Sequence, residues 1–265
     1  IVQLAQKMSA NKSIENIPNL WVKTNGSIHR NQEVDIIDVK MLPILRFDIF
    51  DPKRIYRAMA GKIYRMLPVE FSRGCPYKCA YCSAPAYGAK FSHAGRWLRF
   101  KSIDQIMKEI DFYIREYAVE YFYFVSETFL AMSKDFKREF YKRYEKYRIP
   151  FWFNTRPETV SKEDISCLES IGCHRISIGI DSGNEEFRKK ILKRGYSNEN
   201  VLRAIDVILR SKIQLSVNNI IGFPDETREM IFDTIELNRK FKAHSHSVSV
   251  FQPFRGTELH DYCVS

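Results

Sequence analysis

Short apolar runs alternate with amphipathic helical runs from about residue 67 to the end of the chain. The runs predicted as strands cover residues 68–73, 120–126, 150–155, 175–180, 214–222 and 246–252. Their near-continuous apolar character is typical of strands that helices cover. Strands that alternate with helices in this way predict a parallel sheet with right-handed crossovers.

The segments between these strands carry apolar residues at helical spacing. Helices are predicted over Ser102–Tyr117, Lys134–Tyr147, Lys162–Ile171, Asn184–Leu192, Asn198–Ser211 and Glu226–Lys240. Ser102 and Ser161 are residues of the kind that cap helix N-termini. About six β/α units are too few for a standard eight-unit barrel. The pattern therefore favours an open, incomplete barrel or a doubly wound sheet.

Residues 1–66 show a different pattern. Two short β-prone runs flank Asn25-Gly26, a dipeptide that favours type I′ turns, so they predict a β-hairpin. Pro43 and Pro52 interrupt the stretch that begins at Val34. Because the apolar patterning is too sparse for a separate core, we predict a lead-in over residues 1–66 and a main domain over residues 67–265.

The composition bounds the class of protein. The chain has 265 residues, of which 45% are hydrophobic, and this is enough to bury a core. We find no apolar run of about 18 residues, so no membrane span is predicted. No charged-then-apolar leader opens the chain, which argues against a signal peptide. The chain begins at Ile1 without an initiator Met, so we expect a piece of a longer protein.

The formal net charge is +10, and part of the excess lies in residues 134–148. Apolar or aromatic residues recur there at helical spacing, at Phe136, Phe140, Tyr144 and Tyr147. This favours an outer helix with a solvated basic face. A patch for nucleic acid or another acidic partner is the alternative, and it is not favoured.

Three of the six cysteines form a C-x-x-x-C-x-x-C run, Cys75, Cys79 and Cys82. The other three are scattered, and a secreted disulfide scaffold would be shorter and richer in cysteine. We therefore predict a reducing, cytoplasmic compartment, in which a close cysteine cluster binds metal or is catalytic.

Three thiolates are compatible with more than one kind of metal site. A zinc site needs four ligands, and His93 is the nearest histidine that would complete a Cys₃His set. An iron–sulfur cluster held by three thiolates keeps one iron free for a small molecule, and an unmetallated set is the third alternative. The cluster follows the first strand of a β/α series, and this position favours iron–sulfur.

Polar, charged, glycine and proline residues follow the other predicted strands. The carboxyl ends of parallel strands lie at one edge of a sheet, where α/β proteins place their sites. We expect these residues to face one cavity with the cysteines. They are Ser126, Glu127, Asn154, Arg156, Asp181, Ser182, Gly222 and Pro253.

The octapeptide CPYKCAYC, residues 75–82, resembles the C-x-x-x-C-x-Φ-C signature of radical S-adenosylmethionine (SAM) enzymes, in which Φ is aromatic. The resemblance extends over about residues 67–265. It implies that Cys75, Cys79 and Cys82 hold a four-iron four-sulfur (4Fe-4S) cluster. The open iron would bind SAM, and the reduced cluster would cleave it to a 5′-deoxyadenosyl radical that abstracts hydrogen from a substrate. Together with the strand pattern, this predicts an α/β fold, a partial (β/α)6 TIM-like barrel.

The resemblance also assigns residues to SAM. Tyr81 would lie close to the adenine, and Glu127, after Ser126, would receive the amino group. Asp181 and Ser182, in the run GIDSG, would bond ribose hydroxyls. Segments 218–224 and 251–259, with Asn218, Gly222 and Pro253, would flank the adenine. Asn154 ends a strand at the same edge, and either Arg156 or Arg194 would meet the carboxylate.

Each of these assignments has a structural alternative. Glu127 is also suited to capping the helix that follows it. Gly179 and Gly183 suit tight turns, because glycine accepts positive φ, and Gly222-Phe223-Pro224 suits a strand-ending turn. Cys167 and Cys173 are interpreted as small buried residues.

The lead-in and residues 177–197 and 251–263 look most like the subgroup with a cobalamin-binding domain ahead of the radical core. Residues 1–66 resemble the linker that follows such a domain. No histidine lies in an Asp-x-His-x-x-Gly motif, so any cobalamin would be bound through a domain outside this chain. The implied chemistry is methylation of an unactivated carbon or phosphorus, or a rearrangement. The partners implied are SAM, an unidentified substrate and an electron donor such as a flavodoxin or ferredoxin.

Two other interpretations remain. A methylthiotransferase acting on tRNA or a ribosomal protein shares similar segments, but it carries a further cysteine trio that residues 1–66 lack. A non-catalytic, zinc-stabilised binding module is the other, and the β/α series with a polar carboxyl edge argues against it.

Overall fold

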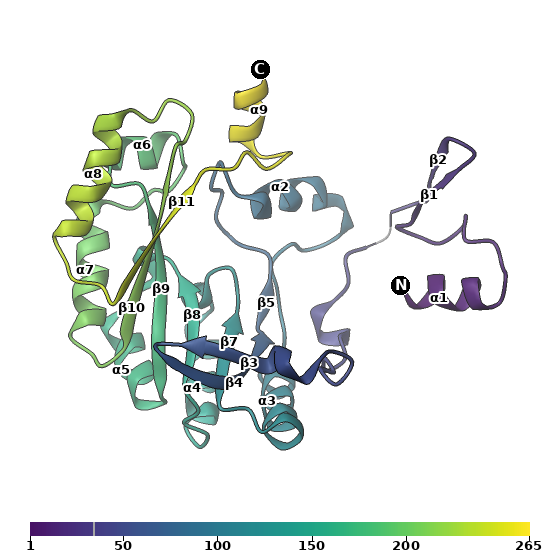
Figure 1. Ribbon diagram of the computed structural model, residues 1–265, viewed down its shortest axis with the longest axis horizontal. Coiled ribbons are helices and arrows are strands. Elements are labelled where there is room, and N and C mark those ends of the chain that lie inside the picture. The colour runs from purple at the N-terminus through teal and green to yellow at the C-terminus, as the bar shows by residue number, and fades with distance from the viewer. Residues whose placement is uncertain (34) are drawn as a thin grey trace.

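The computed structural model describes residues 1–33 and 35–265, and Val34, where the predicted proline-interrupted stretch begins, lies outside the described residues. A seven-stranded sheet forms the centre of the protein, in the order β11-β10-β9-β8-β7-β4-β3 (Figure 1). The strands are β3 Tyr56–Met59, β4 Lys62–Glu70, β7 Tyr121–Val125, β8 Phe151–Thr155, β9 Cys173–Asp181, β10 Gln214–Ile221 and β11 Ser245–Val250.

The six strands from β4 to β11 are parallel to one another, as predicted. Their order in the sheet follows their order in the chain. Right-handed crossovers that all step in one direction bring every connecting helix to the same face. The sheet is therefore singly wound and curled into an open half-barrel, and the alternative of a doubly wound sheet is wrong.

The connecting helices agree closely with the predicted ones and begin at the expected caps. Ser102 precedes the first of them and forms a capping box with Gln105, and Ser161 caps α5 by accepting the N–H of Asp164. The helices are α3 Ile103–Tyr117, α4 Lys134–Tyr144, α5 Lys162–Ser170, α6 Glu185–Lys190, α7 Asn198–Leu209 and α8 Arg228–Arg239.

The hydrophobic core lies between the outer face of the sheet and these helices. Aromatic residues supply much of it, and the rings of Phe124 and Phe151 have centroids 4.5 Å apart. Phe129 stacks on Phe153 at 4.3 Å. The four side chains are fully buried, and burying each of them contributes about 2–3 kcal/mol to stability.

The N-terminal region contains the predicted hairpin, β1 Trp21–Thr24 and β2 Ser27–Arg30, around Asn25-Gly26. Helix α1, Val2–Ser9, precedes it and buries no residue. These elements lie to one side of the half-barrel (Figure 1). No helix among the described residues is long and apolar enough to cross a membrane.

Several elements were not predicted. Strand β3 pairs antiparallel with the first residues of β4, and β4 runs through the boundary predicted at residues 66 and 67. The others are the short pair β5 Ser72–Arg73 and β6 Arg99–Phe100, helices α2 Ser83–Lys90 and α9 Glu258–Val264, and the 3₁₀ helices Val39–Met41, Pro52–Ile55, Ser92–Ala94, Phe129–Ala131 and Pro157–Thr159.

Gly183 marks a close contact between the end of β9 and α8. A Cβ atom there would lie 2.3 Å from the carbonyl oxygen of Asp233 and 2.4 Å from the Cα of Thr234. Its φ does not lie in the left-handed region, so the close approach of two backbones, and not a tight turn, requires glycine at this position.

We therefore expect Gly183→Ala to lower the free energy of unfolding by about 2 kcal/mol, because backbone atoms must move to admit the methyl group. Urea denaturation followed by circular dichroism measures this change. Gly195→Ala is the matched control, since a Cβ at Gly195 meets nothing within 4 Å. If the two variants were equally stable, the backbone at the contact with α8 would be able to move and admit the methyl group without loss of stability.

Candidate active site

The three clustered cysteines lie in the loop of residues 74–82, called here the cysteine loop, between β5 and α2. Gly74 opens the loop at φ +90°, and a Cβ there would lie 2.5 Å from the Trp97 carbonyl oxygen. The N–H of Ala80 donates to the Leu192 carbonyl at 3.2 Å, and the Ala80 carbonyl accepts the N–H of Leu259 at 3.1 Å. Backbone bonds to two distant segments thus hold the loop in place.

The thiols of Cys75, Cys79 and Cys82 line one cavity of about 750 Å³. Cys79 is buried and the other two are half-buried, and all three are free thiols. Burial raises the pKa of the Cys75 and Cys82 thiols above the ordinary value. Three thiols in one cavity are a donor set that fits an iron–sulfur cluster. His93, the candidate fourth ligand of a Cys₃His zinc site, does not line this cavity, and its Nε2 lies 3.4 Å from Glu33 Oε2.

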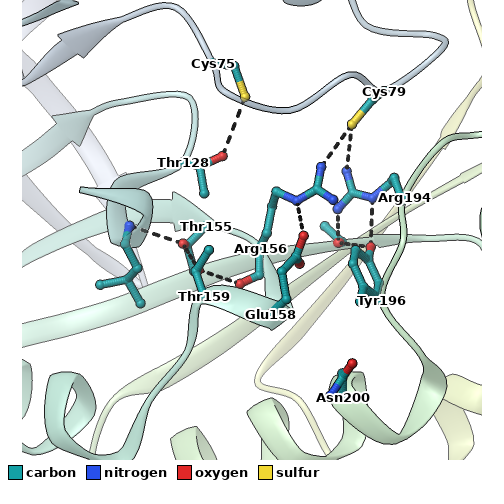
Figure 2. A network of polar contacts seen from close by, with 12 residues as sticks. Cys75, Cys79, Thr128, Thr155, Arg156, Glu158, Thr159, Arg194, Tyr196 and Asn200 are labelled. Carbon is teal, nitrogen blue, oxygen red and sulfur yellow. Dashed lines mark hydrogen bonds and ion pairs between the residues drawn. The ribbon is translucent and has the colours of Figure 1, made fainter. Parts of the chain in front are cut away.

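Two guanidinium groups approach the sulfur of Cys79 (Figure 2). Arg156 Nη1 donates to Cys79 Sγ at 3.0 Å, and Arg194 Nη1 lies 3.9 Å from the same sulfur. Sequence reasoning named these two arginines as alternatives, and the structure places both beside one cysteine. Two cationic groups thus lie beside the sulfur of one cysteine of the loop.

Arg156 follows β8 and is held from two sides. Its Nε donates to Glu158 Oε1 at 2.6 Å (Figure 2), and its guanidinium lies 3.8 Å from the ring centroid of Tyr77 in the cysteine loop. A planar cation over an aromatic face is attracted by the ring quadrupole. The loop and the end of β8 are thereby joined through one side chain.

Arg194 forms a buried ion pair with Asp181 at the end of β9. The Nη1–Oδ2 distance is 2.7 Å, and the side chains are only 8% and 6% exposed. Arg194 also donates to the hydroxyls of Tyr81 and Tyr196 and to the Gly179 carbonyl. Tyr81 donates to Asp181 as well. The predicted adenine and ribose residues, Tyr81 and Asp181, therefore lie in one hydrogen-bonded group.

Ser126 and Glu127, after β7, lie near the cysteine loop. The Ser126 hydroxyl is 2.8 Å from that of Ser72, and Cys75 Sγ is 3.9 Å from the hydroxyl of Thr128. Glu127 is exposed, and its charge adds to burial in raising the pKa of Cys82. Thr128, and not Glu127, is the N-cap residue of the short helix that follows.

The remaining predicted residues do not all join the cysteines. Asn154 and Asn218 line a second cavity of about 400 Å³ on the sheet. Ser182 is fully buried, and its hydroxyl has no partner among the described residues. Gly222, at φ +78°, donates its N–H to Glu226 at 2.6 Å, and Pro253 is exposed after β11. Roles of these residues toward SAM stay predictions.

Sequence reasoning missed Tyr77, Glu158 and Tyr196. Tyr77 lies inside the cysteine motif, and Glu158 and Tyr196 each follow an arginine by two residues. The contact of Tyr77 is with a side chain far away in the chain, and a polar residue two positions after an arginine is too common a pattern to distinguish Glu158 or Tyr196.

A comparison with models of known protein families identifies the family of this chain. The model of the radical SAM superfamily matches residues 69–237, more than half of the chain. The chain belongs to the radical SAM superfamily. It is therefore a radical SAM enzyme, and the family implies a 4Fe-4S cluster and SAM as cofactors.

Relatives of this radical SAM protein include methyltransferases. An uncharacterized methyltransferase of Pyrococcus horikoshii is 26% identical over 99% of this chain and 55% of its own length. A tRNA-2-methylthio-N(6)-dimethylallyladenosine synthase of Sulfurihydrogenibium is 25% identical over 71% of this chain and 44% of its own length.

Among solved structures, the radical SAM methyltransferase TsrM of Kitasatospora setae, with cobalamin and a [4Fe-4S] cluster bound, has a TM-score of 0.71. It is 19% identical and covers 97% of this chain, which covers 50% of TsrM. This likeness confirms the partial-barrel fold. The chain spans about half the length of these relatives.

The Arg194–Asp181 pair yields a prediction that needs no cofactor. Asp181→Asn preserves the side-chain shape and tolerates the positive φ of 69° at this position, but it leaves a buried guanidinium without its carboxylate. We expect the free energy of unfolding to fall by about 3 kcal/mol, as measured by chemical denaturation. Asp206→Asn, which breaks the exposed pair with Arg210, should leave stability unchanged. A similarly small effect at Asp181 would mean that Arg194 does not depend on it.

Proposed function

We propose that this chain is the catalytic core of a radical SAM methyltransferase in which Cys75, Cys79 and Cys82 hold the 4Fe-4S cluster. The carrying observation is the gathering of these thiols in one cavity, with two guanidinium groups beside Cys79. When bound, the cluster supplies the electron that cleaves SAM reductively. Methyl transfer is favoured over a rearrangement because two proteins that match almost the whole chain, the Pyrococcus horikoshii relative and TsrM, are named methyltransferases.

The arginines would offset the negative charge that thiolates and sulfides bring to the site. A guanidinium that donates to a ligating sulfur stabilises added negative charge, and this lowers the free energy of the reduced state. Arg156 is placed for this role by its 3.0 Å contact with Cys79. The residues around the sulfurs would thus tune the site as well as hold it.

For the carboxylate of SAM we favour Arg156 over Arg194. Arg194 donates from all three of its nitrogens, to Tyr196, to Tyr81 and to the Gly179 carbonyl, and pairs with Asp181. Arg156 donates from Nε to Glu158 and from Nη1 to Cys79, and its Nη2 forms no bond among the described residues. Glu127 is an exposed carboxylate near the cysteine loop, as are Glu258 and Asp261 of the cavity lining, and because it follows β7 we assign Glu127 to the amino group. Tyr81 and Asp181 remain the candidates for the nucleoside.

Any cobalamin would be bound by a domain that lies outside this chain. The support is the fold likeness to TsrM, whose structure contains cobalamin, together with the absence of an Asp-x-His-x-x-Gly motif in this chain. An electron donor such as a flavodoxin or ferredoxin would reduce the cluster. Methylthiotransfer is the second candidate, because a methylthio synthase is among the relatives. The upstream cysteine trio of such enzymes is missing from residues 1–66.

We expect anaerobic reconstitution with iron and sulfide to load about four irons per chain, with broad absorbance near about 400 nm. Reduced protein should then convert SAM to 5′-deoxyadenosine, measured by chromatography. Cys79→Ala should abolish this conversion and most of the iron binding, because two sulfur ligands cannot hold the cluster. Cys263→Ser is the control, since Cys263 is exposed and outside the cysteine loop. Stoichiometric zinc without colour, or activity in Cys79→Ala, would contradict the proposal.

Arg156→Gln should weaken SAM binding by about 30-fold or more, since it removes a charge partner of the carboxylate in a site shielded from water. Equilibrium dialysis against the reconstituted protein measures the affinity, and iron content shows whether the cluster is still loaded. Arg210→Gln, on the surface, should bind SAM like the wild type. If an Arg156→Gln protein with a fully loaded cluster bound SAM with unchanged affinity, Arg156 would not be the residue that binds the SAM carboxylate.

A further inference from the structure

The concave face of the half-barrel is polar, although the strands were expected to be apolar on both faces. Residues that point outward along the central strands, such as Phe153, Ile176 and Leu215, are 0% exposed in the core. The residues that alternate with them form rows across the sheet. One row is Tyr123, Trp152, Arg175 and Gln214, and the next is Asn154, Ser177, Ser216 and Ser245.

The second cavity lies over these rows. Its volume is about 400 Å³, within the range of small-molecule sites, and Ala58–Ala60 of the β3–β4 turn contribute to its lining. Trp152, Asn154, Ser177 and Asn218 also line it. A hollow with this lining offers hydrogen bonds and one large aromatic surface to a ligand.

Arg175 is the charged residue of this lining, and it has no acidic partner in the part of the chain that the structure describes. Its Nη1 donates to the hydroxyl of Ser216 at 2.6 Å and to that of Ser245 at 3.1 Å, and its Nη2 donates to Gln214. None of the ion pairs found over residues 1–33 and 35–265 includes Arg175. A half-buried cation surrounded only by neutral acceptors lacks the countercharge that such groups have in most proteins.

Two more donors of the same row lack acceptors. Arg175 Nε and Trp152 Nε1 are buried and have no hydrogen-bond partner among the described residues. Trp152 and Arg175 are register partners in adjacent strands, so these donors belong to neighbouring residues. The row therefore holds more donors than acceptors, and its net charge is positive.

We propose that this cavity binds the substrate through an oxyanion, a carboxylate or a phosphate, which Arg175 recognises. A guanidinium pairs with either group through two parallel hydrogen bonds. Ser216 and Ser245 hold the guanidinium in place in the absence of the anion. The substrate class is thus an organic anion, and a planar portion would contact Trp152. This inference rests on the proposed function only in calling the bound molecule the substrate.

Small aryl anions test the site without the cluster or SAM. Benzoate and phenyl phosphate should bind the full chain with a dissociation constant of roughly millimolar order, as expected for fragments. Saturation-transfer NMR at constant ionic strength detects this binding. Neutral benzamide should show at least a tenfold weaker effect. Binding of benzoate alone would identify a carboxylate, and binding of phenyl phosphate alone a phosphate; equal binding of benzamide would overturn the proposal.

Arg175→Gln should abolish binding of both anions, and Arg210→Gln should leave it unchanged. Because Arg175 also links β9, β10 and β11, its loss can destabilise this edge, so a second variant keeps it in place. Ser245→Asp puts a carboxylate beside the Arg175 guanidinium and should abolish anion binding while raising the melting temperature. Anion binding that survives Ser245→Asp in a folded protein would assign Arg175 a purely structural role.

The anion site and the cluster can fail independently. Arg175 does not line the cysteine cavity, so anion binding and the cleavage of SAM to 5′-deoxyadenosine depend on different residues. Loss of anion binding in a protein that still cleaves SAM supports the anion site. A wild-type chain that cleaves SAM but binds neither anion would overturn this inference and leave the proposed function intact.

Discussion

The buried ion pair between Arg194 and Asp181 is the interaction on which the site depends. Removing both charges from water is costly, and the pair persists because the remaining donors of Arg194 also find acceptors. Through Tyr81 and Cys79 the same guanidinium reaches the cysteine loop. One side chain therefore links the end of β9 to the segment that carries the three thiols, and it adds to the backbone bonds of Ala80 that hold this loop.

The order of the parallel strands in the sheet, which follows their order in the chain, decides which face of the sheet the helices cover. It sends all the covering helices to the outer face, so the apolar residues of each strand pack there and the alternate residues line the hollow of the half-barrel. That hollow is free to be polar because none of the helices in residues 1–33 and 35–265 packs on it. The cavity around Arg175 lies in this hollow, whereas the cysteine cavity lies outside the strands, so the proposed substrate site and the proposed cofactor site are separate.

Most elements of the barrel were predictable because their signals are local. Apolar periodicity and capping serines placed α3 and α5 to within a residue or two. Strand β4 was harder: Pro68 suggested a strand start, yet β4 begins at Lys62. Strand β3 pairs with β4 only up to Arg65 of β4. Pro68 lies beyond this paired part, so its lack of an N–H group costs no hydrogen bond to β3. Helix α2 was missed because Pro85 and Gly88 weaken its helical pattern.

The sequence by itself determined the cysteine spacing, the β/α order and therefore the superfamily, since these depend on residues close together in the chain. Only the tertiary structure decided that both Arg156 and Arg194 meet Cys79, that Asp181 is already paired, and that Asn154 and Asn218 belong to a separate cavity. These contacts join side chains on different strands and loops. Which of them meet depends on sheet register and on the path of loops, and neither is encoded in a local pattern.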